Sequence, residues 1–320
     1  VDPGDAGAIM PIKVADEEGV TDSLAIYRAI NYAVDHGAKV INVSLGSKAI
    51  SKLEQQAVER AHAMGALVVI AAGNSNESLV AFGPSSAKHA LAVGQIDYSP
   101  PDGEAGGVRS TVSNWGPNLG LVAPGEQIYS LCSKDNKHVL PSIRKTGYYK
   151  QDGTSFATPM VAATASLLWA KNPALTNEQV ADIILATATD MGDSGWDGMT
   201  GAGLLNAAAA LRADTSEKLT VMITNIRTNR DPRGKVVSVD VYGTVRGTFK
   251  EYTVEAGKGK NATRFNAVAG PYREGSDYQH ITRLIVQDVL RGSDEWILRI
   301  RAVDNNGREH IASTPFTLPE

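Results

Sequence analysis

The sequence predicts an α/β fold: a three-layer α/β/α domain built on a parallel sheet over residues 1–213, followed by an all-β sandwich over residues 214–320. The first domain is indicated by short runs that are apolar throughout and by the helical patterns between them. Such strands are typical of parallel sheets that helices cover on both faces. The second domain is indicated by a change after Ala213, where the apolar period shortens to two.

The elements of the first domain alternate along the chain. Gly37 and Gly65 stop two of the expected helices, and Thr176 with Gln179 forms a capping-box pattern at the start of another. The expected strands are 8–14, 39–44, 66–71, 90–93 and 119–123, and the expected helices are 23–36, 50–64, 155–171, 176–188 and 204–211. The helix over 155–171 has little polar surface, so we expect it at the centre of the domain.

The second domain is expected to consist of short antiparallel strands. Strand-like runs cover 236–242, 249–254, 281–286, 296–303 and 309–316, and residues 304–307 form a strong turn signal between the last two. This density of strands indicates a sandwich of immunoglobulin or fibronectin type. We expect the linker between the two domains at Asp214-Thr215-Ser216.

Composition excludes several classes of function. The net charge is −4 with no block of like charges, which argues against nucleic acid as a partner. No apolar run approaches the roughly 20 residues that span a bilayer. The one cysteine, Cys132, excludes an intramolecular disulfide and is expected to be a buried apolar residue. No signal segment is visible at Val1, and a disulfide-free chain fits a secreted bacterial protein.

A candidate site is expected where three of the parallel strands end. Ligands of open parallel sheets bind beyond the carboxyl ends of the strands. Here those ends carry small residues, which let a substrate backbone approach closely. The three ends read Ser44-Leu45-Gly46, Ala71-Ala72-Gly73-Asn74 and Ala123-Pro124-Gly125.

The segment that carries most chemistry opens the helix over 155–171. Ser155 stands where unpaired N–H groups and the positive end of the helix dipole converge, which favours an oxyanion beside it. Pro159 is expected to lie within the first turn, where a missing N–H is tolerated. Taken alone, this segment is also explained as a plain helix cap. Asn74 ends a buried strand and could donate a second hydrogen bond to the oxyanion.

Seven segments in order resemble the subtilisin-like serine proteases (the subtilase, S8-type family) over about residues 8–212. They are Val40-Ile41-Asn42-Val43-Ser44-Leu45-Gly46, Ala71-Ala72-Gly73-Asn74, Ala92-Val93-Gly94, Ser113-Asn114-Trp115-Gly116, Val122-Ala123-Pro124-Gly125, Gly153-Thr154-Ser155-Phe156-Ala157-Thr158-Pro159 and Gly201-Ala202-Gly203-Leu204-Leu205-Asn206. Any one of them is a weak signal, but coincidence does not explain seven in the family order.

The resemblance implies a role for each part of the site. Ser155 is then the catalytic nucleophile and Asn74 the side-chain donor to the oxyanion. Ser44, Leu45 and Gly46 would form an edge strand along which a peptide substrate lies, and Ala71, Ala72 and Gly73 the other wall of the primary specificity pocket. Either Phe82 or Gly83 would lie near the floor of that pocket, and Pro84 would follow a cis peptide bond.

Metal and cofactor needs are expected to be small. The resemblance implies no required cofactor and no catalytic metal. Structural calcium is common in the family, but the acidic residues Asp16-Glu17-Glu18 are better explained as a solvated turn.

The base and the acid of a catalytic triad are missing from the matching segments. The family order along the chain is Asp, His, Ser, and only residues 1–7 precede the expected strand over 8–14. None of the histidines fits the family's motif, and these are His36, His62, His89, His138, His280 and His310. The chain is therefore a fragment, the larger piece of a nicked protease with an N-terminal companion chain, or a pseudoprotease.

Of these explanations we favour an incomplete sequence, because a pseudoprotease would more simply lose the residues and keep the sheet. The expected function is a secreted serine endopeptidase that acts on peptides or proteins through an acyl-enzyme on Ser155, with Asp and His outside this chain. The rival from another class is a peptide-binding scaffold without turnover. On the favoured hypothesis, this chain alone is inactive.

Overall fold

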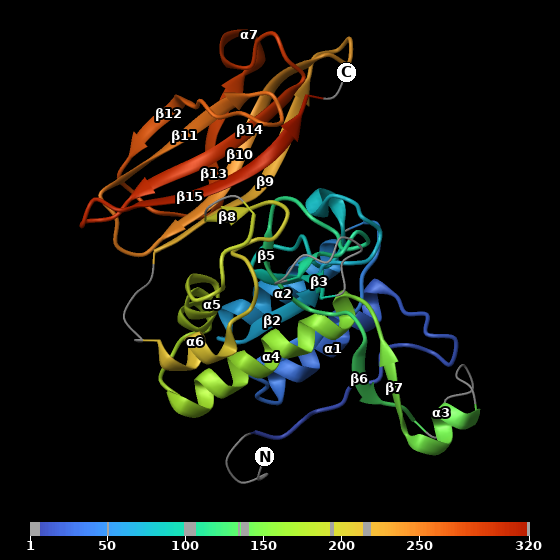
Figure 1. Ribbon diagram of the computed structural model, residues 1–320. Coiled ribbons are helices and arrows are strands. Elements are labelled where there is room, and N and C mark those ends of the chain that lie inside the picture. The colour runs from blue at the N-terminus through green and yellow to red at the C-terminus, as the bar shows by residue number, and fades with distance from the viewer. Residues whose placement is uncertain are drawn as a thin grey trace.

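The computed structural model describes residues 7–49, 51–98, 107–133, 135, 141–192, 195–213 and 219–318. An α/β domain and a β-sandwich lie against each other, with the sandwich seated over one end of the sheet (Figure 1). Within the described residues, the chain passes from the first domain to the second only once, although one short strand of the first joins a sheet of the second.

A mostly parallel sheet forms the middle layer of the first domain. β1 (Val40–Val43), β2 (Leu67–Ala71), β3 (Ala90–Asp97) and β5 (Leu119–Pro124) are parallel neighbours in that order. β4 (Val108–Arg109) pairs antiparallel with the end of β3. The carboxyl ends of β1 and β2 therefore lie side by side, which brings the segments 44–46 and 71–73 to one edge of the sheet.

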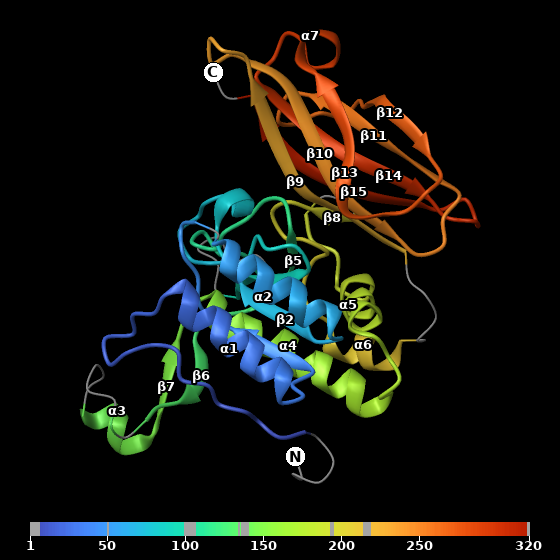
Figure 2. The ribbon, with the colours of Figure 1, turned by 180° about the vertical axis from the view of Figure 1, so that it is seen from behind.

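One face of this sheet is covered by α1 (Ser23–Asp35) and α2 (Lys52–Ala63), which Figure 2 shows in front of the strands. Val68 and Ile70 of β2 point into the core that these helices close. Side chains two apart in a strand share a face, so alternate residues of β2 serve opposite layers. Side chains cap the start of both helices: Asp22 accepts a hydrogen bond from the N–H of Ala25 at 2.7 Å, and α2 opens with a capping box.

The other face is covered by α4 (Thr154–Lys171), α5 (Asn177–Ala186) and α6 (Ala207–Arg212). Leu67 and Val69 of β2 pack into this second core. α4 contacts all four parallel strands, which confirms the central position predicted from its apolar sequence. The capping box predicted at the start of α5 is also present. Among the helices in the described ranges, none is long and apolar enough to cross a membrane.

The strand predicted over residues 8–14 is wrong. The described part of this segment has no regular secondary structure, and the side chain of Ile9 is 93% exposed. Apolar composition identifies a segment that can be buried, but a strand also needs a neighbour to hydrogen-bond with. In the described residues β1 pairs only with β2, so the outer edge of β1 has no strand beside it.

Several short elements had no counterpart in the sequence predictions. A hairpin of β6 (Ile128–Leu131) and β7 (Tyr148–Gln151) leads directly into α4, and α3 (Pro141–Thr146) lies between its strands. A 3-10 helix, η1 (Leu79–Ala81), follows β2. These pieces are too short to show a hydrophobic period, so their sequence pattern gives little signal.

The second domain is a two-sheet sandwich. In one sheet the order is β13-β10-β9, and in the other it is β12-β11-β14-β15, with apolar side chains of both sheets packed between them. The strands are β9 (Thr220–Arg230), β10 (Val236–Arg246), β11 (Glu251–Lys258), β12 (Asn266–Tyr272), β13 (Ser276–Ile285), β14 (Glu295–Val303) and β15 (Glu309–Thr317), and the short helix α7 (Val286–Val289) follows β13. The predicted turn after β14 forms around Asp304, whose Oδ1 accepts from the N–H groups of Asn306 and Arg308.

The first domain contributes a strand to the second. β8 (Trp196–Asp197) pairs parallel with β15, although it precedes the predicted boundary after Ala213. The indole of Trp196 packs in the sandwich core, while its Nε1–H donates to the carbonyl of Leu119 in β5 at 2.7 Å. One side chain thus joins the two cores. The predicted linker over 214–216 lies outside the described residues.

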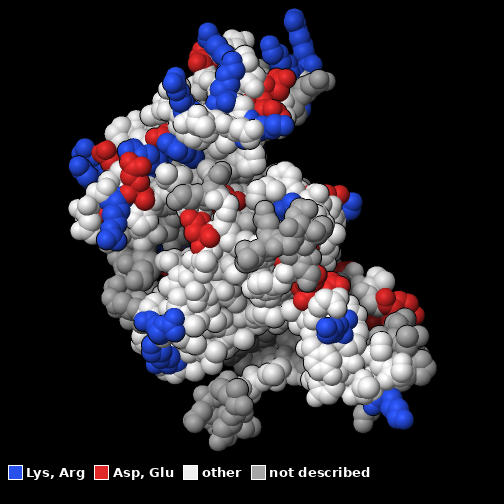
Figure 3. Space-filling model, viewed as in Figure 1, with Lys and Arg blue, Asp and Glu red and all other residues white. Residues whose placement is uncertain are grey.

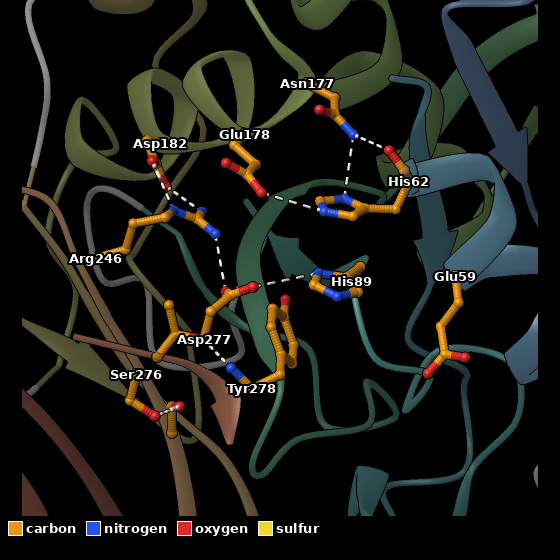
Figure 4. A network of polar contacts seen from close by, with 12 residues as sticks. Glu59, His62, His89, Asn177, Glu178, Asp182, Arg246, Ser276, Asp277 and Tyr278 are labelled. Carbon is orange, nitrogen blue, oxygen red and sulfur yellow. Dashed lines mark hydrogen bonds and ion pairs between the residues drawn. The ribbon is translucent and has the colours of Figure 1, made fainter. Parts of the chain in front are cut away.

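A polar network clamps the two domains together (Figure 4). Arg246 of β10 donates to both carboxylate oxygens of Asp182 in α5, at 2.7 and 3.1 Å, and to Asp277 of β13 at 2.9 Å. Asp182 also accepts from the hydroxyl of Thr220 at 2.7 Å. The guanidinium and Asp182 are mostly buried, so each is compensated chiefly by the other.

Two stacked histidines lie beside this network. The rings of His62 in α2 and His89 before β3 are 3.7 Å apart and nearly parallel. Burial lowers the pKa of His89 to about 3, and the neighbouring positive charges of His62, Lys88 and Arg246 act in the same direction. Asp277 faces His89 at 3.9 Å, while Glu178 faces His62 at 3.2 Å. At neutral pH His89 therefore packs as an uncharged ring.

Removing the guanidinium of this network is expected to destabilise the protein strongly. In Arg246→Met, Asp182 and Asp277 lose their cation while they stay partly buried, which costs about 3 kcal/mol in the free energy of unfolding. Urea denaturation followed by tryptophan fluorescence measures this loss. The matched control is Arg301→Met, which breaks a more exposed pair with Glu309 and should cost well under about 1 kcal/mol. Equal effects of the two substitutions would contradict the clamp.

The buried His89 is expected to make stability depend on pH. Its pKa is near 6.5 in the unfolded chain and about 3 in the folded protein, so the unfolded chain binds more protons between these values. The free energy of unfolding should fall as the pH is lowered from 6.5, by up to about 1.4 kcal/mol per pH unit. Denaturation between pH 6.5 and about 4.5, above the range where most carboxylates titrate, isolates this effect.

The control for that measurement separates His89 from the other histidines. His89→Gln should reduce the slope, whereas His36→Gln, at the exposed end of α1, should leave it unchanged. A slope that survives in His89→Gln would show that another group carries it.

Candidate functional site

Ser155 is the second residue of α4, so its N–H lies in the first turn, where helix N–H groups have no partner within the helix. The preceding Gly153 is the N-cap and has a φ of 138°, a conformation that favours glycine. A Cβ at Gly153 would also lie 3.3 Å from the side-chain nitrogen of Asn74. The glycine therefore lets the start of α4 approach Asn74 closely.

Asn74 is held against the residue before the nucleophile. Its Oδ1 accepts from both the backbone N–H and the hydroxyl of Thr154, each at 2.9 Å. The hydroxyl oxygen of Thr154 in turn accepts from the N–H of Gly73 at 3.1 Å. Because the amide oxygen is engaged in this way, the amide nitrogen is the group that is left to donate. The structure thus brings Asn74 to Thr154, the residue before Ser155, while the convergence of Ser155 and Asn74 on one oxyanion stays a prediction.

Ser44 and Ser155 are joined by a reciprocal pair of hydrogen bonds. The hydroxyl of Ser44 donates to the backbone carbonyl of Ser155 at 2.9 Å, and the hydroxyl of Ser155 donates to the carbonyl of Ser44 at 3.3 Å. The expectation that Pro159 lies in the first turn is wrong, since it lies further inside α4. A proline has no N–H, so the carbonyl four residues earlier, that of Ser155, has no helix donor. Ser44 supplies the donor instead.

The predicted substrate-binding segments flank this point, with one correction. Ser44, Leu45 and Gly46 follow β1 but form no strand within the described sheet. The pairing begins one residue later, where Ser47 exchanges backbone hydrogen bonds with Gly83 at 2.7 and 2.9 Å. An edge strand needs at least one hydrogen-bonded neighbour, and among the described residues β1 pairs with β2 only as far as Val43.

The second predicted substrate-binding segment, residues 71–73, leaves the sheet more gradually than residues 44–46. Ala71 is the last residue of β2, and the N–H of Ala72 still bonds to the carbonyl of Val93 in β3 at 2.9 Å. Gly73 then turns with a φ of 102°, which directs Asn74 toward α4. The small residues predicted here are therefore used partly for close packing and partly for the turn.

Asn114 is a structural residue of the site that the sequence predictions did not assign. It is fully buried, its Oδ1 accepts from the N–H groups of Ser75 and Glu77, and its amide donates to the carbonyl of Ala72 at 2.9 Å. Its own N–H donates to the carbonyl of Gly73. Asn114 thereby holds both sides of the loop that carries Asn74. The sequence signal that could have identified Asn114 was its place in one of the seven matching segments.

Phe82 occupies the space between the two substrate-binding segments. A Cβ at Gly46 would lie 2.8 Å from the ring of Phe82, and one at Gly73 would lie 2.5 Å from it. Phe82, rather than Gly83, is thus the residue that stands at this gap. The peptide bond between Gly83 and Pro84 is cis, as the resemblance implies.

The described histidines are engaged elsewhere. His62 and His89 belong to the domain clamp, and His36 stacks on Tyr32 at the end of α1. In the sandwich, His280 and His310 lie 3.2 and 3.4 Å from aspartates. His138 lies outside the described residues. In the part of the chain that is described, the hydroxyl of Ser155 therefore has a backbone carbonyl as its partner, not an imidazole.

Two further predictions concern single segments. Cys132 is buried and free, as expected. At the acidic turn, one oxygen of Asp16 accepts from the N–H groups of Glu18 and Val20, so this carboxylate caps the turn itself. Within the described ranges, no group of three or more His, Cys, Asp or Glu side chains is arranged to hold a metal ion.

Comparison with known proteins identifies the family. The sequence profile of the subtilase family (Peptidase S8) matches residues 6–203. Alkaline elastase YaB from Bacillus sp. (strain YaB) is 36% identical over 201 residues, which is 63% of this chain and 47% of that protein. Subtilisin BL from Lederbergia lenta is 35% identical over 198 residues, 62% of this chain and 65% of that protein. The chain thus spans about half to two thirds of the length of these relatives.

Solved structures agree on the fold of the first domain. A lanthipeptide protease superposes with a TM-score of 0.55 at 28% identity, covering 63% of this chain and 69% of that one. A cold adapted subtilisin-like serine proteinase superposes with a TM-score of 0.52 at 29% identity, covering 63% and 66%. The predicted α/β fold is thereby confirmed as subtilisin-like. Since the profile covers well over half of the 320 residues, the chain belongs to the subtilase family.

Proposed function

We propose that the protein is a serine endopeptidase that hydrolyses peptide bonds through an acyl-enzyme on Ser155. The observation that carries this proposal is the placement of the Ser155 hydroxyl at the start of α4, beside an Asn74 side chain whose oxygen is already tied to Thr154. A helix N-terminus and a fixed amide donor both stabilise negative charge as it develops on a carbonyl oxygen.

The proposed reaction follows from these two groups. The Oγ of Ser155 forms a bond to the carbonyl carbon, and the carbonyl oxygen becomes an oxyanion held by the Asn74 amide and the N–H of Ser155. A base takes the hydroxyl proton and passes it to the nitrogen of the scissile bond, which leaves as the amine. Water then attacks the ester with the help of the same base, which releases the acid and restores Ser155.

We propose that the base and its orienting acid are a His and an Asp outside this chain. The carbonyl of Ser44, which accepts the hydrogen bond from Ser155, is not basic enough to take the proton. The outer edge of β1 is unpaired in the described residues, so a further strand could join the sheet there and carry such residues to the site. An upstream segment or an N-terminal companion chain would supply that strand.

We infer that the substrate is an extended peptide or protein segment, bound along residues 44–46 and 71–73. The broad face around α4 shows few charges in Figure 3, which fits a polypeptide better than a polyanion. We propose that hydrolysis needs no cofactor or catalytic metal, and that the protein works outside the cytoplasm, as a secreted bacterial enzyme.

The sandwich is proposed to be of the fibronectin type and to brace the protease domain. In support, β12 pairs with β11, so that the sheets have the orders β9-β10-β13 and β12-β11-β14-β15. The pairing of β8 with β15 and the clamp around Arg246 favour a rigid attachment over a freely moving substrate-docking module.

A fluorophosphonate probe tests the proposed nucleophile and the missing base together. The 320-residue chain should label weakly, because nothing activates Ser155, whereas the chain together with its upstream residues should label strongly at Ser155. Ser155→Ala should abolish the labelling of both forms. Strong labelling of the 320-residue chain would contradict the need for an outside base. Absence of labelling in the extended form would favour the peptide-binding scaffold.

Loss of the amide donor is expected to slow turnover without preventing folding. In Asn74→Ala, kcat of the active form should fall about 10²- to 10³-fold with little change in KM, a range taken from a subtilisin rather than from this chain. Hydrolysis of a chromogenic peptide measures both constants. Asn305→Ala, in an exposed turn of the sandwich, is the matched control and should leave kcat unchanged. A rise in KM with kcat unchanged would contradict the oxyanion role.

A further inference from the structure

The position of a bound carbonyl defines where the neighbouring side chain must go. A carbonyl carbon at the Ser155 hydroxyl with its oxygen at the Asn74 amide lies between the ends of β1 and β2. Ser44 bonds directly to Ser155, and Gly73 immediately precedes Asn74. The side chain of the residue that contributes this carbonyl therefore enters the gap between the backbones of residues 44–46 and 71–73.

That gap is filled from within by the ring of Phe82. The same ring atom, Cε1, lies 2.8 Å from where a Cβ of Gly46 would be and 2.5 Å from that of Gly73. Real Cβ atoms do not approach so closely, so glycine on both sides is what gives the ring its space. The side chain of Phe82 is only 7% exposed, which means that it is packed between the walls and does not merely line an open pocket.

The backbone around Phe82 resists a movement of the ring out of the gap. Its N–H donates to the carbonyl of Leu79 at 3.0 Å, and its carbonyl accepts from the N–H of Ser86 at 2.9 Å. The next residue, Gly83, is bonded in both directions to Ser47, directly beside one of the walls. The phenyl ring is thus mounted on a segment that is fixed at both ends.

We propose that Phe82 determines specificity by closing the pocket, so that the residue on the acyl side of the scissile bond must have a small side chain, such as alanine or glycine. The inference rests on the proposed function of Ser155 and adds the substrate class. Its physical basis is steric: a large side chain would have to displace a buried ring and the packing on both sides of it.

Peptide boronic acids test this proposal without requiring turnover. The Ser155 oxygen forms a bond to boron, and the hydroxyl proton is released to solvent, which leaves a tetrahedral boronate. Binding of acetyl-Ala-Ala-boroalanine and acetyl-Ala-Ala-borophenylalanine to the extended form, the chain together with its upstream residues, is measured by calorimetry. We expect the alanine compound to bind at least about tenfold more tightly. In Phe82→Ala this preference should shrink at least about tenfold, mainly through tighter binding of the phenylalanine compound.

Two variants keep the test decisive. Phe82→Leu retains an apolar side chain and should also reduce the preference for the alanine compound. It replaces Phe82→Ala if that variant does not fold. Phe265→Ala, in which the lost ring stacks on Arg299 in the sandwich, is the matched control and should leave the ratio unchanged.

The possible results separate this proposal from the one it rests on. Equal or tighter binding of the phenylalanine compound to the unaltered chain would overturn the role of Phe82 and leave Ser155 as nucleophile. A preference that survives in a folded Phe82 variant would do the same. Failure of both compounds to bind the unaltered extended form would overturn the nucleophile itself, and the specificity proposal with it.

Discussion

The start of α4 is the constraint on which the candidate site depends. Thr154 ties it to Asn74 and Gly73 at the end of β2, and Ser155 ties it to Ser44 at the end of β1. The second tie exists because Pro159 leaves the carbonyl of Ser155 without a helix donor. A feature that would weaken an isolated helix thus becomes an attachment between the helix and the sheet, and it fixes the nucleophile relative to both strand ends.

Small residues also allow close packing around the candidate site. Gly153 lets the helix reach Asn74, while Gly46 and Gly73 make room for the ring of Phe82. A pair of strand ends that could have formed an open pocket is therefore filled by the chain's own side chain. Asn114 holds the loop that carries Asn74, so the site is built from buried polar side chains that satisfy backbone groups and from glycines that allow close contact.

The sandwich is part of the structural unit and not a loosely tethered addition. Trp196 crosses from one core to the other, and Arg246 pairs with carboxylates from both domains. Buried charges of this kind need all of their partners, and separation of the domains would leave Arg246 and Asp182 without each other. His89 adds a group that must stay uncharged for the packing to persist.

The sequence by itself determined the order of the main strands and helices, the capping box of α5, and the places of Ser155 at the start of α4 and of Asn74 after β2, because these follow from local periodicity and from motifs that recur in order. Only the tertiary structure decided that residues 8–14 form no strand, that Pro159 frees a carbonyl for Ser44, and that Phe82 stands between Gly46 and Gly73. Those outcomes depend on contacts between backbone groups and side chains that are far apart in the chain. Local sequence periodicity does not reveal such contacts.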